Sequence, residues 1–177
     1  MNGTRASGPQ AVTVSPGGTV QVSAAPTLTF STGATRYVFQ GWSDGGAAAH
    51  TVTAPASGNY PVITAKYKLQ HLVGVGFSGR GSVTLAPAST DGFYDDGSTV
   101  QVTAAPASGF QLAGWNGDLS GTALSQTITV NDQVVVSAGF QQPFAITGIV
   151  NAASFVSGPV SPVEIVTIFG LSIGAPP

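Results

Sequence analysis

The sequence predicts an all-β chain made of small antiparallel modules, and three observations lead to that prediction. Apolar and polar residues alternate in short stretches, which is the period of a strand with one buried face. Turn residues, among them 24 Gly and 12 Pro in 177 residues, separate these stretches, at intervals of roughly 8 to 12 residues that are typical of all-β folds. No long window keeps apolar side chains at the three-and-four spacing of an amphipathic helix.

Residues 97–140 carry the clearest strand pattern. Val100 and Val102 alternate with polar residues, and Ile128 and Val130 repeat the alternation. We therefore expect these four side chains to face one core, with the intervening threonines and glutamine on the opposite face.

An internal repeat divides the first 141 residues into two modules. Four stretches recur in the same order, and the copies differ mainly by a longer Pro26–Arg36 connection in the first. The matching pairs are Gly18–Pro26 with Ser98–Pro106, Tyr37–Trp42 with Phe110–Trp115, His50–Thr53 with Gln126–Thr129, and Ala65–Tyr67 with Ala138–Phe140. The predicted domains are residues 1–68, residues 69–141 and a C-terminal segment, residues 142–177.

Each module has about 70 residues, a size at which a hydrophobic core is marginal. Large aromatic side chains therefore dominate the expected core, since one buried Trp or Phe removes ~150–250 Å² from water. The predicted structural core residues are Tyr37, Phe39, Trp42 and Tyr67 in the first module and Phe110, Leu112, Trp115 and Phe140 in the second.

The C-terminal segment contains an apolar strand, Val163–Phe169, with no polar face. Such a strand needs neighbours on both faces, and the sequence suggests no partner for it within the chain. We therefore predict that this segment is either part of an immunoglobulin-like domain or a strand donated to the sheet edge of a neighbouring molecule. The candidate assembly residues are Val163, Ile165, Val166, Ile168 and Phe169.

The amino-acid composition excludes several kinds of partner and chemistry. Only 7% of residues are charged, the net charge is −2, and the five cations do not cluster, so we expect no nucleic-acid partner. No apolar run approaches the ~20 residues that span a bilayer. The first residues do not begin a signal peptide, so an export signal would lie upstream. Cysteine is absent, which excludes thiol catalysis, cysteine metal sites and disulfides.

Two motifs resemble catalytic or cofactor signatures but have simpler structural explanations. Gly41–Gly45 fits the G-x-S-x-G elbow, yet that elbow needs a helix after the serine, and the sequence continues into a strand at Thr51–Thr53. Gly74–Gly79 fits the dinucleotide fingerprint G-x-G-x-x-G, which also needs a following helix, but residues 80–85 again read as a strand. We predict a turn and a bend, and no catalytic or cofactor-binding residues.

The acidic stretch Asp91–Gly97 could supply oxygen ligands to calcium, but it lacks the spacing of a calcium loop. We predict Asp-Gly turns there and leave calcium binding open. His50 and His71 are far apart in the sequence, and no zinc site is predicted.

Residues 81–85 and 97–140 resemble the divergent internalin-type B repeat of bacterial surface proteins. They contain its Gly-x-Val-Thr opening, its Thr-Val-x-Val-Thr-Ala-x-Pro strand, its aromatic strand ending in Trp, and its closing strand ending in Ala-x-Phe. Residues 18–67 resemble a related module, with the signature Phe39–Gly46. Residues 149–170 are similar to the opening of an immunoglobulin-like domain of secreted bacterial proteins. These resemblances imply a small β-grasp-like or antiparallel fold, an extracellular location and a spacer or adhesive role.

Three functions follow as hypotheses. The first is a non-enzymatic extracellular structural or adhesion module whose partners are proteins, either neighbouring modules or other copies of the chain. The second is a carbohydrate-binding accessory module, which predicts solvent-facing Trp42 and Trp115. The third is a subunit of an extracellular filament, assembled by strand addition.

Overall fold

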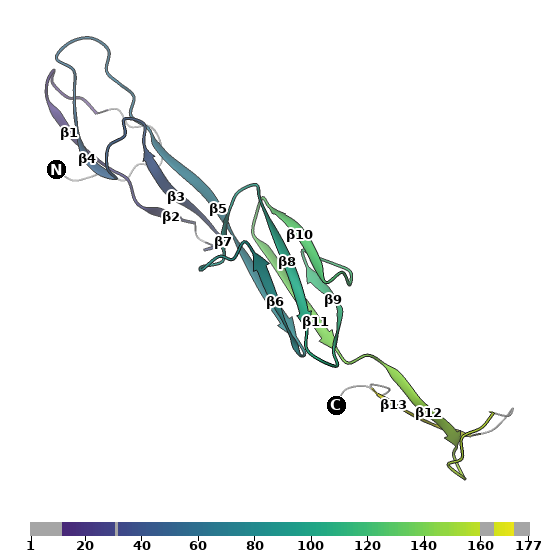
Figure 1. Cartoon of the computed structure of the whole chain (residues 1–177). Coiled ribbons are helices and arrows are strands. Elements are labelled where there is room, and N and C mark those ends of the chain that lie inside the picture. Colours follow the sequence, from purple (N-terminus) through teal and green to yellow (C-terminus); the bar gives the residue numbers. More distant parts are fainter. Residues whose placement is uncertain (1–11, 31, 160–164, 172–177) are drawn as a thin grey trace. The chain divides into compact units, whose positions relative to one another are not determined.

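The computed structural model describes residues 12–30, 32–159 and 165–171, and the fold is all-β as predicted (Figure 1). No helix occurs among these residues. The chain divides into two compact units, one up to Gln70 and one from His71. The strands are β1 (Thr19–Ser23), β2 (Thr27–Thr29), β3 (Thr35–Trp42), β4 (Ala49–Thr53), β5 (Ala65–Ser78), β6 (Gly81–Ala86), β7 (Phe93–Asp95), β8 (Ser98–Pro106), β9 (Gln111–Gly117), β10 (Ser125–Val130), β11 (Val134–Gln141), β12 (Ala145–Asn151) and β13 (Val166–Leu171).

The first unit holds two small groups of strands. β1 and β4 form an antiparallel pair in which Val20 lies opposite Val52 and Val22 lies opposite His50. β3 pairs with β2 on one side and with β5 on the other. Ala34 is the one fully buried apolar residue in the described part of this unit. Four of its aromatic residues are half-buried and make edge-to-face ring contacts, namely Tyr37, Phe39, Trp42 and Tyr67, whereas Phe30 and Tyr60 are exposed.

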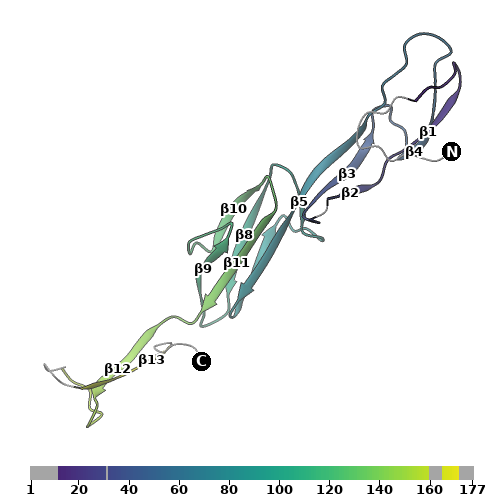
Figure 2. The same cartoon turned by 180° about the vertical axis from the view of Figure 1, so that it is seen from behind.

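The second unit holds two sheets that enclose the hydrophobic core (Figure 2). One sheet has the strand order β10-β8-β6, and in the other β11 lies between β5 and β9. Val100 and Val102 are 0% exposed, and Ile128 and Val130 are also buried, which confirms the predicted alternation. The core also draws Val136, Ala138 and Phe140 from β11 and Trp115 from β9.

β11 is the central strand of the second sheet, and its two neighbours run in different directions. It pairs in parallel with β5, with Val136 beside Val75. It pairs antiparallel with β9, with Ala138 opposite Trp115 and a register shift after Gly139. β5 itself begins in the first unit and ends in the second.

β12 and β13 form a hairpin, and one expectation about the C-terminal segment is wrong. β13 pairs antiparallel with β12, with Ile149 opposite Ile168 and Asn151 opposite Val166. The apolar strand therefore has a partner in its own chain, contrary to the expectation that it has none. The reason is that Ala145–Asn151 forms a strand of its own and the chain then turns back on it.

The short strand β7 contributes a buried tyrosine to the core. Tyr94 is buried, its hydroxyl donates to the Pro87 carbonyl over 2.8 Å, and burial raises the pKa of the phenol. Tyr94→Phe removes one buried hydrogen bond and should lower the free energy of unfolding by about 1 kcal/mol. Urea denaturation followed by circular dichroism measures this change. A cost near zero would mean that the hydroxyl bond contributes nothing to folding.

Candidate functional site

The two tryptophans are held in the same way in the two units. Trp115 on β9 is 4% exposed and its indole N–H donates to the Ala123 carbonyl over 2.8 Å. Trp42 on β3 is half-buried and donates to the Ala48 carbonyl over 3.1 Å. Each carbonyl lies just before the next strand, β10 or β4. The only polar atom of each indole therefore ties two strands together, and Trp115 presents no face to a sugar ring.

The other predicted core residues fall into two groups that follow the division into units. Leu112 and Phe140 are buried, and Phe110 packs at the edge of the same core, with the Arg80 guanidinium 5.9 Å from its ring centre. In the first unit, Tyr37, Phe39 and Tyr67 are half-buried. The ring of Phe39 lies 6.0 Å from that of Trp42 and 5.5 Å from that of Tyr67.

The structure brings together an acid and a histidine that the sequence did not link: Asp44 lies in the turn after β3, and His50 lies in β4. Asp44 Oδ2 lies 2.9 Å from His50 Nε2, and His50 Nδ1 lies 2.8 Å from the Ala47 carbonyl oxygen. Asp44 Oδ1 also accepts a hydrogen bond from Gly46 N–H. Both ring nitrogens of His50 face acceptors, and only the doubly protonated ring can donate to both. We call Asp44, Gly46 and His50 the turn clamp.

The environment of the turn clamp shifts both pKa values in the directions that keep the pair charged. The hydrogen bond to Asp44 raises the pKa of His50 above its ordinary 6.5. The Gly46 N–H, and then His50, lower the pKa of Asp44 below 3.8. Gly46 is part of this arrangement, because a Cβ at this position would collide with the His50 ring. The His50 ring also makes an edge-to-face contact with Trp42, with 5.8 Å between ring centres.

The turn clamp predicts a specific pH dependence. The contribution of His50 is fully present below pH ~6.5 and is lost as the pH rises through the raised pKa, whereas that of Asp44 is lost as the pH falls through its lowered pKa. The first unit should therefore be most stable between about pH 3.8 and pH 6.5, the ordinary pKa values of Asp44 and His50, where both contributions are fully present. An NMR titration of the His50 ring should give a pKa above 6.5, and Asp44→Asn should lower it. An unchanged His50 pKa in that variant would contradict the pairing.

Ser43, the serine of the elbow-like motif, has a structural partner. Its Oγ accepts from the Thr64 N–H and its own N–H donates to the Thr64 carbonyl, both over 2.9 Å. A turn follows, and then strand β4. The predicted turn at Gly41–Gly45 is therefore confirmed, and Ser43 fixes the approach of Thr64 to the end of β3.

The second glycine motif, Gly74–Gly79, lies in β5 and the turn after it, and strand β6 follows as predicted. Gly79 has a φ of +79°, and a Cβ there would collide with the Phe140 backbone. This position therefore requires glycine because the chain approaches β11 closely, a purely structural reason for the residue.

The acidic stretch Asp91–Gly97 is engaged in local hydrogen bonds. Asp91 Oδ1 accepts from the Phe93 N–H and from the Ser89 hydroxyl, and Asp96 Oδ1 lies 3.0 Å from Nε2 of the buried His71. Within the described part of the chain, no group of three or more His, Asp or Glu side chains is arranged to hold a metal ion.

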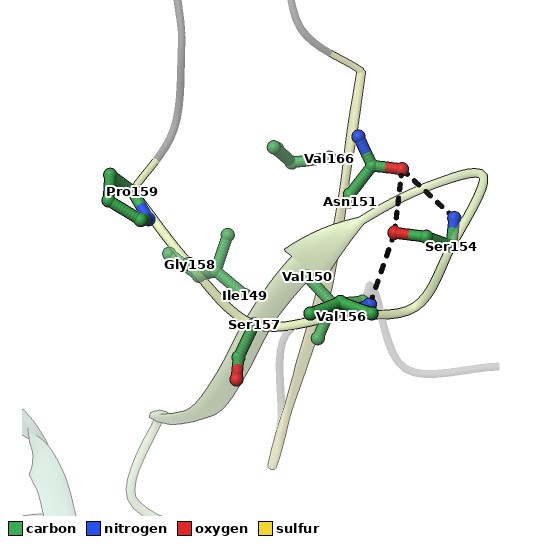
Figure 3. Close-up of a pocket in the computed structure, with 9 residues that line it drawn as sticks. All are labelled: Ile149, Val150, Asn151, Ser154, Val156, Ser157, Gly158, Pro159 and Val166. Carbon is green, nitrogen blue, oxygen red and sulfur yellow. Dashed lines mark hydrogen bonds between the residues drawn. The ribbon is translucent and has the colours of Figure 1, made fainter.

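A small cavity of about 220 Å³ lies at the turn that follows β12 (Figure 3). Asn151 Oδ1 accepts from the Ala153 and Ser154 N–H groups, and Ser154 Oγ accepts from the Val156 N–H. These bonds are internal to the turn and stabilise it. Phe155 adopts a φ of +56° with its side chain 63% exposed.

Four of the five candidate assembly residues belong to the described residues, whereas Val163 lies outside them. Ile165 is exposed, and its carbonyl accepts from the Ala152 N–H over 2.9 Å. Val166 is half-buried, while Ile168 and Phe169 are 46% and 47% exposed. The hairpin therefore leaves large apolar side chains of β13 in contact with water.

Comparison with known proteins gives one match. Among the described residues, no helix has the length and apolar character needed to span a membrane. No curated protein and no solved structure matches the chain. Residues 72–143 match the model of the divergent InlB B-repeat domain, a family of repeat modules found in bacterial surface proteins.

Proposed function

We propose that this chain is a non-enzymatic structural and adhesive segment of a bacterial surface or secreted protein, built from two consecutive B-repeat-type modules. The observation that carries the proposal is the family match over residues 72–143, which includes both sheets of the second unit. The proposed boundaries are residues 1–68, 69–141 and 142–177, the last being the opening of an immunoglobulin-like domain.

Strand register supports a second module in the first unit. In β1 and β4, Val20 lies opposite Val52, and in β8 and β10, Val100 lies opposite Ile128. The sequence repeat aligns Val20 with Val100 and Val52 with Ile128. A slip of one residue would move every side chain to the other face, so agreement in register is a strong sign of common descent.

The main-chain hydrogen bonds at the ends of the β1–β4 and β8–β10 pairs also join matching positions of the repeat. The Ala24 N–H donates to the Ala48 carbonyl, and the Ala104 N–H donates to the Leu124 carbonyl. Together with the similar indole bonds of Trp42 and Trp115, they favour one module design used twice.

Surface labelling tests the location. Antibodies raised against the chain should label intact cells of the source bacterium or detect the protein in its culture medium. Labelling that requires lysis would contradict an extracellular role.

A replacement experiment separates a spacer from an adhesin. Deleting residues 1–141 from the parent protein should reduce attachment of the cells to surfaces. If the segment is a spacer, an unrelated pair of β modules of similar length should restore attachment. If it is adhesive, only the native modules should do so. Unchanged attachment after the deletion would contradict both roles.

The exposed apolar side chains of the hairpin favour one further candidate, self-assembly through β13. A two-stranded hairpin is marginally stable alone, and β13 pairs only with β12 among the described strands. Sedimentation analysis tests it, because a filament subunit should associate with rising concentration and Ile168→Lys should prevent this. A monomer at all concentrations would leave the immunoglobulin-like opening as the better explanation.

A further inference from the structure

The outer edge of β1 in the first unit differs from the matching edge in the second unit. In the second unit, β8 lies between β10 and β6. In the first unit, β1 pairs with β4, the counterpart of β10, and no described strand lies on its other side. The comparison rests on the duplication proposed above, which aligns Thr19–Ser23 with residues 99–103.

The backbone groups on that edge are identified by the alternation of an antiparallel pair. The Ala24 N–H donates to Ala48 and the Ala54 N–H donates to Gly18, so even-numbered residues of β1 bond to β4. The N–H and C=O groups of Thr19, Gln21 and Ser23 therefore point away from β4. In β8, the matching odd-numbered residues face β6, because Ala107 N–H donates to Arg80 and Thr103 lies opposite Thr84.

Side-chain burial points to the same missing neighbour. Val100 and Val102 are 0% exposed, and Val83 and Leu85 of β6 pack against the core that contains them. Their counterparts Val20 and Val22 are only half-buried. A third strand with two apolar residues at alternate positions would extend the sheet and cover these valines, as β6 does in the second unit.

The chain's own N-terminal residues fit this position poorly. Ser15–Gly18 forms a turn in which the Gly18 N–H donates to the Ser15 carbonyl. A hairpin closed by this turn would place Val14 beside Thr19 and Val12 beside Gln21, which is the exposed face. Residues 12–14 form no strand, and residues 1–9 contain no pair of large apolar residues at alternate positions.

We propose that the outer edge of β1 binds a strand from another polypeptide chain, in the antiparallel register that β6 adopts on β8. The partner strand is uncharged and carries apolar residues opposite Val22 and Ala24, the positions that match those of Leu85 and Val83 in β6. The main-chain hydrogen bonds of Gln21 and Ser23 hold it, and the two apolar residues complete the core. This is strand addition to a sheet edge.

The test uses the full chain and a blocked peptide that copies β6, Gly81–Ala86. Saturating peptide should slow amide hydrogen exchange of Gln21 and Ser23, the two outward-facing residues opposite Ala86 and Thr84 in this register, by about tenfold or more. Exchange of Val20 and Val22 should change little, because these amides already bond to β4. A peptide with Thr84→Pro, which lacks a donor on the bonding edge, should have no effect.

Matched protein variants complete the test. Gln21→Pro removes the outward N–H and should abolish the slowing. Gln21→Ala keeps the N–H and loses only the side-chain bond to Thr51, so it should retain the slowing. No slowing with the β6 peptide would overturn the proposal. Slow exchange at Gln21 in dilute chain without peptide would also overturn it, because the chain's own residues would then cover the edge. Neither result affects the surface-labelling test of the proposed function.

Discussion

Trp115→Ala should remove a large part of the stability of the second unit. Its side chain is buried among residues of both sheets, and truncating a buried Trp costs about 3–5 kcal/mol. A module of about 70 residues has a total stability of only ~4–10 kcal/mol at the usual value per residue. Guanidinium denaturation followed by circular dichroism measures the loss, and the fluorescence of Trp42 reports separately on the first unit.

Two variants serve as controls for this prediction. Trp42 is half-buried, so Trp42→Ala should cost clearly less than Trp115→Ala. Trp115→Phe keeps most of the apolar contact but removes the bond to the Ala123 carbonyl, and should cost about 1–3 kcal/mol. A loss below about 1 kcal/mol for Trp115→Ala would show that the indole is not central to the core.

Gly117→Ala should be strongly destabilising to the second unit, as should Gly79→Ala, because a Cβ at either position would collide with main-chain atoms of β11. Gly117 has a φ of +88°, and a Cβ there would collide with the Val135 carbonyl oxygen. The left-handed conformation alone costs about 1–2 kcal/mol for alanine. The collision adds to this cost because the partner is main chain in the neighbouring strand and cannot rotate away, so we expect a total loss of about 3 kcal/mol or more.

Gly109→Ala measures the cost of the backbone conformation alone, so the difference from Gly117→Ala gives the cost of the collision. Gly109 has a similar φ of +80°, but its Cβ would meet no atom within 4 Å. It should therefore cost only the ~1–2 kcal/mol of the backbone conformation. The denaturant concentration at the unfolding midpoint measures the stability loss of both variants, provided that the slope of the free energy of unfolding against denaturant is unchanged. Equal losses would mean that β9 and β11 do not approach each other as closely as described.

The local features of this fold were predictable from the sequence because they depend on residues close together in the chain. Alternation at Val100, Val102, Ile128 and Val130 predicts their common burial, and the turn at Gly41–Gly45 follows from its glycines. The all-β class follows from the same signals. Nothing in this reasoning depends on which strands are neighbours.

Pairings between distant segments were not predictable in the same way. The parallel pairing of β5 with β11 joins residues about 60 positions apart, and the sequence pattern of either strand fits many partners. The pairing of β12 with β13 was not predictable either, because the apolar pattern of Val163–Phe169 does not identify which strand lies beside it. The Asp44–His50 contact was missed because it depends on the path of the turn through Gly45, which has a φ of +79°.

The proposed duplication would account together for the sequence repeat, the two similarly bonded tryptophans and the proposed acceptor edge, and one NMR measurement tests it directly. Non-hydrogen-bonded antiparallel pairs bring α-protons close together. We therefore expect Hα–Hα nuclear Overhauser contacts between Gln21 and Thr51 and between Gln101 and Thr127, which occupy matching positions in the two strand pairs. Contacts in one pair with a one-residue offset in the other would contradict two copies of one module.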